Sequence, residues 1–355
     1  MSGTSLDGVD TVLVDCQRGL EVLGFVSAPF PDALRTTLLG LNQCGNNELH
    51  VAALAANELA HLYASAVTQL LQQTNMRPSN VRAIGCHGQT VRHRPDLRFT
   101  IQLQNPALLA ELTSMPVVAD FRSRDIAAGG HGAPLVPVFH DIAFRHAEQD
   151  RVVVNIGGMS NITLLLRGQP VWGFDCGPGN VLMDAWSNQC LGSRFDIDGS
   201  WASSGTTIPS LLGTMNKEPY FSAAPPKSTG RDLFNLLWLE EKMGEVKYRA
   251  ADVQATLLEL TACTLANDIA RHAPLCTEVF LCGGGARNTA LKKRLGQLLV
   301  GKAIHKTDHL GIPAQQVEAV AFAWLAQLAV NGKAIDLTRI TGAKHPNILG
   351  AIYPA

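Results

Sequence analysis

The feature that most constrains this chain is a set of glycine-rich turns, each joined directly to an apolar, β-prone run. They read GTSLDG at 3–8, NIGGMSN at 155–161 and CGGGARN at 282–288. Glycine reaches positive φ angles and lets a phosphate group approach backbone N–H groups closely. The first two turns lie about 150 residues apart, each between strand-like runs. We therefore expect two hairpins, each opening one of two similar halves.

Strand-like and helix-like patterns mix along the whole chain. Amphipathic periodicity predicts helices, over 46–73, 252–273 and 313–332, with Asp252 as an N-cap and Pro313 near a first turn. Apolar β-prone runs predict strands, over 81–88, 116–121, 151–158 and 278–285. This mixture and the length of 355 residues predict an α/β class with mixed sheets and two domains.

Charge and hydropathy exclude several function classes. The formal net charge is −1, so there is no basic field to bind nucleic acid or anionic lipid nonspecifically. No apolar run approaches the ~20 residues that span a bilayer, and no signal peptide precedes the first turn. We therefore expect a cytoplasmic enzyme with a small-molecule substrate, acting on neither nucleic acid nor membranes.

The third glycine turn permits a second interpretation. VFLCGGGARN reads as a strand, a glycine turn and a helix, with Asp308 about 20 residues further on, which is similar to a dinucleotide fingerprint. Asn288 stands where that fingerprint has a last glycine or alanine, so a nicotinamide enzyme is disfavoured. The sequence has neither a P-loop motif nor the G-x-S-x-G motif of serine hydrolases.

Several longer motifs carry a closer resemblance. MSGTSLDGVD, CHGQTVRH, ADFRSRDIAAGGHGAPLVP, NIGGMSNIT, GFDCGPGN and CGGGARN resemble the anhydro-N-acetylmuramic acid kinase family, over essentially the whole chain. That family belongs to the actin, hexokinase and heat-shock ATPase superfamily. The resemblance implies two ribonuclease-H-like α/β domains around an interdomain ATP cleft. We expect the first over 1–127 plus 311–355 and the second over 128–310.

The resemblance also implies an activity. The enzyme would open 1,6-anhydro-N-acetylmuramic acid with water and phosphorylate O6 from ATP, giving N-acetylmuramic acid 6-phosphate and ADP in cell-wall recycling. A homodimer follows from family analogy alone. Two alternatives stay open: another sugar or carboxylate kinase of the superfamily, and a non-enzymatic ATP switch of the heat-shock or filament type.

Candidate site residues come from these motifs. Asp175 in GFDCGPGN is the expected base for water, since it should end a strand before a sharp glycine turn. Asp7 is the expected Mg²⁺ ligand, because a carboxylate beside a phosphate requires a cation. The expected substrate-binding residues are His87, Gln89, Asp120, Arg122 and Glu318. The expected nucleotide-binding residues are Gly3, Thr4, Ser5, Leu6, Asp7, Gly8, Val9, Asp10, Asn155, Gly157, Gly158, Ser160, Asn161, Gly283, Gly284, Gly285 and Asn288.

The N-terminus departs from the family pattern. Members of the family have apolar residues before MSGTSLDGVD that form a strand leading into the phosphate turn, and here Met1 stands where that strand should end. In a ribonuclease-H-like sheet this strand is central, so its ladder and core contacts stabilise the fold. We expect restored upstream residues to raise both the melting temperature and the activity.

Overall fold

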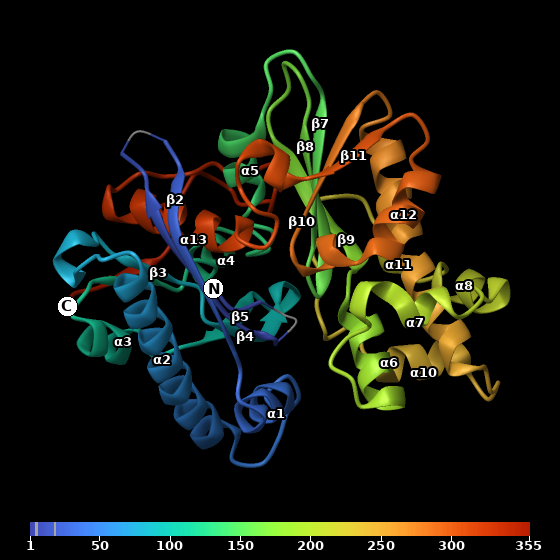
Figure 1. The fold of residues 1–355 in the computed structure, drawn as a ribbon, viewed down its shortest axis with the longest axis horizontal. Helices are drawn as coiled ribbons and strands as arrows, with labels where there is room; N and C mark the ends of the chain where they lie inside the picture. The colour runs from blue at the N-terminus through green and yellow to red at the C-terminus, as the bar shows by residue number, and fades with distance from the viewer. Residues whose placement is uncertain (4–5, 18) are drawn as a thin grey trace. The chain divides into compact units, whose positions relative to one another are not determined.

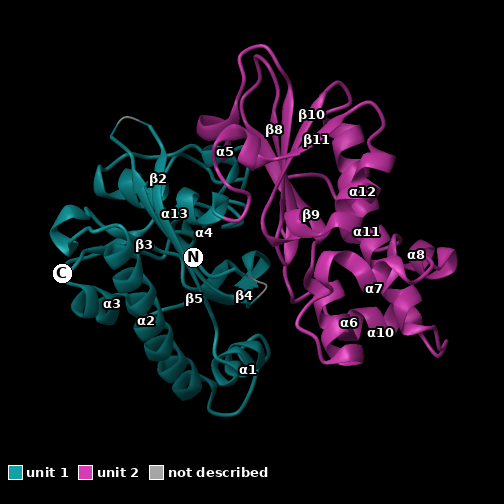
Figure 2. Ribbon diagram, in the orientation of Figure 1, with its two compact units in different colours: residues 1–139, 316–355 teal, residues 140–315 magenta. Residues whose placement is uncertain are grey.

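The chain separates into two compact units in a computed structural model that describes residues 1–3, 6–17 and 19–355. Residues 1–139 and 316–355 form the first unit, and residues 140–315 form the second (Figures 1 and 2). The C-terminal segment thus returns to the N-terminal unit. The family's domain boundaries, after residues 127 and 310, stay predictions.

The second unit is built on one five-stranded sheet with the order β11-β10-β7-β8-β9. Its strands are β7 (Arg151–Ile156), β8 (Met159–Leu165), β9 (Trp172–Pro178), β10 (Glu278–Cys282) and β11 (Ala303–Lys306). The first three form an antiparallel meander, and β10 and β11 run parallel to β7. This is the strand order of a ribonuclease-H-like sheet, and the predicted strands at 151–158 and 278–285 are confirmed.

Helices complete the second unit. They are α6 (Val181–Leu191), α7 (Ser200–Ser203), α8 (Pro209–Met215), α9 (Pro219–Ser222), α10 (Leu236–Met243), α11 (Ala250–His272) and α12 (Thr289–Leu298). The predicted helix at 252–273 is confirmed, but Asp252 as its N-cap is wrong. The N-cap is Arg249, and Asp252 lies in the first turn, where its carboxylate accepts from the Thr206 N–H at 2.8 Å. A tertiary hydrogen bond therefore takes the place of the cap.

The first unit divides its strands among three small sheets. β1 (Gly8–Asp15) pairs antiparallel with β2 (Glu21–Pro29), and β4 (Gln89–Arg94) pairs with β5 (Phe99–Leu103). The third sheet has the order β12-β6-β3, with strands β12 (Ala351–Tyr353), β6 (Val117–Ala119) and β3 (Ile84–Cys86). The strands predicted at 81–88 and 116–121 are confirmed, each as a core of three residues.

Helices also cover the sheets of the first unit. They are α1 (Asp32–Gly40), α2 (Glu48–Gln73), α3 (Pro106–Thr113), α4 (Ser123–Ala127) and α13 (Val317–Val330), while α5 (Pro137–Phe144) crosses the division between the units. The helix predicted at 46–73 is confirmed. No helix among the described residues has both the length and the apolar character that crossing a membrane requires.

The helix predicted at 313–332 begins four residues late. Pro313 precedes α13, so its placement near the first turn is wrong. The backbone of Ala314 is held elsewhere, since its carbonyl accepts from Gly283 at 2.8 Å and its N–H donates to Asp308 at 3.0 Å. These groups are therefore not available for a helical turn.

Candidate active site

Three glycine turns meet in the second unit. A Cβ on Gly179 would lie 2.4 Å from the Gly157 carbonyl oxygen, and one on Gly285 would lie 2.3 Å from Cγ2 of Ile156. Gly283 has φ +80°, and a Cβ there would lie 2.5 Å from Oδ1 of Asn155. We call Gly157, Gly158, Gly179, Gly283 and Gly285 the glycine cluster. The turns predicted at 155–161 and 282–288 are thus in contact, together with the GPGN turn.

Backbone hydrogen bonds fix the cluster. Gly179 N–H donates to Gly158 O at 2.8 Å, and Asn180 N–H donates to Gly157 O at 2.9 Å. Asn180 also donates from its side chain to Ile156 O at 3.4 Å. Sequence reasoning did not select Asn180 as a site residue, although it stands in the quoted GPGN motif.

Several predicted nucleotide-binding side chains have structural partners in the second unit. Ser160 is fully buried and its hydroxyl donates to Gly177 O at 3.3 Å. Asn288 is the N-cap of α12, where Oδ1 accepts from the Leu291 N–H at 3.0 Å. The Asn161 backbone pairs with that of Asp175 across β8 and β9. The Ser160 and Asn288 side chains shape the turns, and contact of these residues with a nucleotide stays a prediction.

Alanine substitutions at two neighbouring glycines distinguish the effect of packing on stability from the effect of phosphate approach on ATP binding. Gly285→Ala is expected to lower the free energy of unfolding by about 1–3 kcal/mol, because the new Cβ overlaps Ile156. Gly284→Ala is the matched control, since a Cβ at Gly284 has no heavy atom within 4 Å. The control should keep its stability and raise KM for ATP. Urea unfolding and steady-state kinetics measure both, and equal unfolding midpoints would contradict the packing argument.

Asp175 lies in the middle of β9 and is 5% exposed. The expectation that it ends the strand is wrong, because pairing with β8 continues to Pro178. Its Oδ2 accepts from the Thr229 N–H at 3.1 Å, and its own N–H donates to Lys227 O at 3.2 Å. The Tyr220 hydroxyl donates to the Asp175 carbonyl at 2.8 Å. The segment 220–229 therefore holds the carboxylate in one orientation, as a positioned base requires.

Lys227 is a buried cation that sequence reasoning missed. It is 6% exposed, and its Nζ donates to Tyr220 O at 3.3 Å. The ammonium lies 5.5 Å from the ring centre of Phe174 and 4.9 Å from that of Tyr220. Burial raises the pKa of the Asp268 carboxyl, and the Lys227 charge opposes that rise. Lys227 and Asp268 thus interact as opposite charges beside Cys176 of β9.

A second set of predicted residues meets in the first unit. The Arg122 Nε–H donates to Nε2 of His87 at 3.0 Å, and the Arg122 guanidinium also donates to Gly132 O at 2.7 Å. Gln89 donates from its side-chain amide to Gly3 O at 3.1 Å. The CHGQT and ADFRSRD motifs and the first glycine turn therefore lie together, as expected for one ligand site.

His87 is held as a neutral ring. Because Nε2 accepts from Arg122, Nδ1 carries the proton and donates to Gly88 O at 2.8 Å. Burial and the Arg122 charge hold the pKa of His87 well below its usual value. His87 therefore orients Arg122 and does not act as an acid near neutral pH.

The other predicted residues of the first unit differ in exposure. Leu6 and Val9 are 1% and 2% exposed and belong to the hydrophobic core, which gives their side chains a packing role. Asp7 is exposed, and Glu318 is half-buried in the first turn of α13. Asp120 is half-buried with φ +58°. Thr4 and Ser5 lie outside the described residues.

Asp125 in ADFRSRD is structural. It is fully buried, and its two oxygens accept from the Thr341 hydroxyl and the Gly132 N–H, each at 2.7 Å. Burial raises the pKa of this carboxyl, and the two hydrogen bonds oppose that rise. Both hydrogen bonds therefore favour the charged form against the cost of its burial.

Thr341→Val is expected to lower the free energy of unfolding by about 1–3 kcal/mol at pH 8, because it removes a donor to a buried carboxylate. The pKa of Asp125 in the folded variant should rise further. A raised carboxyl pKa contributes stability below the unfolded value that is lost as pH rises through the folded value, so the deficit should shrink at pH 4. Urea unfolding at both pH values tests this, with Thr341→Ser as control. If the loss of stability is the same at both pH values, then lost packing and not the lost hydrogen bond to Asp125 causes it.

The chain matches one family model over its full length. The model described as anhydro-N-acetylmuramic acid kinase covers residues 1–355. Relatives with that name include proteins of Bordetella parapertussis, 54% identical, and Cupriavidus pinatubonensis, 52% identical. A third, from Nitrosomonas europaea, is 51% identical. The matches span 100% of this chain and 95%, 97% and 98% of those relatives.

Proposed function

The chain belongs to the anhydro-N-acetylmuramic acid kinase family, and we propose that it opens 1,6-anhydro-N-acetylmuramic acid with water and phosphorylates O6 from ATP. Water adds at C1 as the bond from C1 to the bridging oxygen breaks, and this oxygen becomes O6. The γ-phosphoryl group then passes to O6, leaving ADP. The products are N-acetylmuramic acid 6-phosphate and ADP.

The observation that carries this proposal is the buried carboxylate of Asp175, which the Thr229 N–H orients at 3.1 Å. Ring opening by water requires a base, whereas a simple transfer to an existing hydroxyl has no need of a second nucleophile. We assign that base to Asp175. The backbone of Lys227 contacts that of Asp175, and we propose that the Lys227 ammonium supplies positive charge close to the developing negative charge.

Open backbone in the glycine turns supports ATP as the phosphoryl donor. A Cβ on Gly284 would meet no heavy atom within 4 Å, and one on Gly157 would meet only Met159 O, at 3.5 Å. A phosphate can therefore approach the backbone N–H groups there. At Gly179, Gly283 and Gly285, in contrast, other atoms of the chain occupy the space that a side chain would need. This close packing holds the turns in place.

Mg²⁺ is proposed with Asp7 as a protein ligand. No cluster of three or more histidine, cysteine or acidic side chains that could hold a metal occurs among the described residues. This fits magnesium, which usually takes one or two carboxylates and completes its shell with phosphate oxygens and water. Asp7 is an exposed residue of the first glycine turn, so it can supply one such oxygen. The ion would neutralise charge on the phosphates when bound.

The substrate carries a lactyl carboxylate and hydroxyl groups, and the first unit offers partners for both. Arg122 is oriented by His87 and Gly132 O, and a guanidinium pairs well with a carboxylate. We propose Gln89, Asp120 and Glu318 as partners for the hydroxyl and amide groups. The place of action is proposed to be the cytoplasm, and a homodimer is proposed by family analogy alone.

The test is a reaction with Mg-ATP and 1,6-anhydro-N-acetylmuramic acid in ¹⁸O-water, analysed by mass spectrometry. The expected product is heavier by one phosphoryl group and one labelled water, with the label at C1. Phosphate without labelled water would indicate an ordinary sugar kinase and overturn the hydrolytic step. ATP hydrolysis without any sugar product would favour the ATP-switch alternative.

A further inference from the structure

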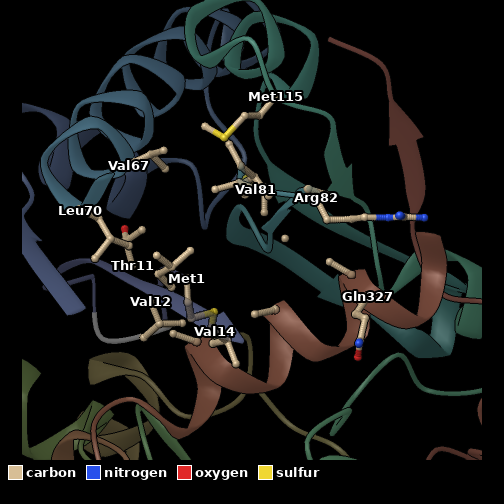
Figure 3. A pocket seen from close by; sticks show the side chains of 18 of the residues that line it. Met1, Thr11, Val12, Val14, Val67, Leu70, Val81, Arg82, Met115 and Gln327 are labelled. Carbon is tan, nitrogen blue, oxygen red and sulfur yellow. The ribbon is translucent and has the colours of Figure 1, made fainter. Parts of the chain in front are cut away.

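A cavity of about 570 Å³ lies within the first unit (Figure 3). Its lining is mainly apolar and includes the side chains of Val12, Val67 and Met115. Such a lining offers a water molecule few hydrogen-bond partners. The sheet of the second unit, in contrast, carries buried polar side chains on three adjacent strands.

These side chains are Asn155 of β7, Asn161 of β8 and Asp175 of β9, and we call them the polar row. Asn155 pairs with Asn161 in the antiparallel register, and Asn161 pairs with Asp175 in the same way. Residues directly opposite each other on antiparallel strands share one face of the sheet, with Cβ atoms roughly 4.5–5.5 Å apart. The three side chains therefore stand next to one another across three strands.

Packing against α11 shows which face Asp175 takes. The Phe174 ring lies 5.1 Å from that of His272 on α11, and the Cys176 thiol is hydrogen-bonded to the Asp268 carboxyl, also on α11. Successive residues of a strand point to opposite faces, so Asp175 points away from α11. The register with β8 skips Cys176, which is a bulge of the kind that often re-aims a side chain beside an active site.

Asn161 shares the face that α5 covers. Two residues further along β8, and so on the same face, the Thr163 hydroxyl is hydrogen-bonded to Nδ1 of His140 on α5 at 2.8 Å. The polar row lies two residues beyond that contact. It thus belongs to the face of the sheet opposite α11.

Asn161 has an acceptor without a partner among the described residues. Its Oδ1 is buried and accepts no hydrogen bond from them. The oxygen of Asn155 differs, since the Cys282 thiol donates to it at 3.7 Å. Asp175 cannot serve as the donor to Asn161, because an ionised carboxylate only accepts. A buried amide oxygen without a donor is costly, so it indicates a role toward a ligand.

Two acceptors side by side suit a water molecule. Water donates two hydrogen bonds, and at about 2.8 Å each they span acceptors roughly 4.5 Å apart. This matches the spacing of opposite side chains in the polar row. The Thr229 N–H already orients the Asp175 carboxylate through Oδ2. A water between Asn161 and Asp175 thus has both O–H bonds directed, and a lone pair is left to attack C1.

We propose that Asn161 is a second catalytic residue, whose Oδ1 holds the attacking water together with Asp175. This role rests on the function proposed above and takes the place of the nucleotide contact predicted for Asn161. As the water oxygen bonds to C1, one of its protons passes to Asp175, and the other stays on the new C1 hydroxyl, hydrogen-bonded to Asn161. The electron pair of the breaking C1–O bond goes to the bridging oxygen, which becomes O6 and takes the γ-phosphoryl group.

Asn161→Ala removes this acceptor without adding bulk. It is expected to lower kcat at least about tenfold, because the water loses one of its two directing contacts. KM for ATP should stay within about twofold of the unchanged value. A nucleotide contact would give the opposite pattern, a raised KM for ATP with kcat retained.

Asn161→Asp keeps an acceptor oxygen and adds a second carboxylate opposite Asp175. Adjacent carboxylates raise the pKa at which the pair gives up its last proton. The acid limb of the kcat profile, where activity falls as pH decreases, should therefore move up by about one pH unit or more, and activity should recover above it. ¹³C NMR of the carboxyl groups measures the same shift without substrate. The other titratable groups around this part of the sheet do not change in the variant: His140, Cys176, Tyr220, Lys227 and Asp268.

Thr163→Val is the matched control, because Thr163 is a buried polar residue on the same strand and face. It should lower the midpoint of urea unfolding, since the hydrogen bond to His140 is lost, but leave kcat and the acid limb as they are.

Two different outcomes separate this role of Asn161 from the kinase activity itself. Labelled sugar product from the unchanged enzyme, together with near-normal kcat of Asn161→Ala or an acid limb of Asn161→Asp that does not move, would overturn the role of Asn161 and leave the kinase assignment intact. An unchanged enzyme that gives no labelled sugar product would overturn the proposed function, and the role of Asn161 with it.

Discussion

Asp175→Asn is expected to lower kcat by about 10²–10⁴-fold, the usual contribution of a positioned base, while the protein remains folded. Asparagine has the shape of aspartate and its amide oxygen can still accept from the Thr229 N–H. The variant therefore loses the ability to take a proton from water and little else. Because the loss concerns the transition state, kcat and kcat/KM should fall together.

The control for this variant is Asp198→Asn, the same change at an exposed residue of the second unit. Asp198 has φ +56°, a conformation that asparagine tolerates equally well. Its kinetics and melting temperature should match those of the unchanged enzyme. Turnover of Asp175→Asn within a few-fold of normal, in a protein with an unchanged circular dichroism spectrum, would show that another group activates the water.

The sequence predicted strands best where a long apolar run is also hydrogen-bonded to neighbouring strands along its whole length. The valine run at 151–158 became β7, which has a partner along each edge. The runs at 81–88 and 116–121 were also predicted as strands but form strands of three residues. The length of a ladder depends on the neighbouring strand as well as on the run itself, and β3 has a partner along one edge among the described residues.

The glycine turns could be predicted from the sequence, whereas the contacts of isolated side chains could not. Glycine turns can be recognised in the sequence because only glycine permits a contact as close as that of Gly283 with Asn155. Lys227 cannot be recognised in this way, since one lysine in an irregular segment is indistinguishable from a solvated one until Phe174 and Tyr220 enclose it. For the same reason the sequence did not show that His87 accepts from Arg122. Tertiary packing decides both roles.

Lys227→Met is expected to lower the free energy of unfolding by about 3–5 kcal/mol at pH 8, because it leaves buried acidic groups without their cation. Methionine keeps the apolar stem that packs on Phe174 and Tyr220. The pKa of Asp268, already raised by burial, should rise further once the opposing Lys227 charge is gone. Turnover should also fall, since this cation stands beside Asp175.

The pH dependence and a second substitution separate the electrostatic cause from lost packing. A carboxyl with a raised folded-state pKa contributes stability below its unfolded value, and this is lost as pH rises through the folded value. The deficit of Lys227→Met should therefore be smaller at pH 4 than at pH 8. Adding Asp268→Asn should recover part of the stability at pH 8 only, as measured by urea unfolding in a double-mutant cycle. A deficit that is equal at both pH values and unaffected by Asp268→Asn would mean that Lys227 acts through its contacts with the aromatic rings, not through its charge.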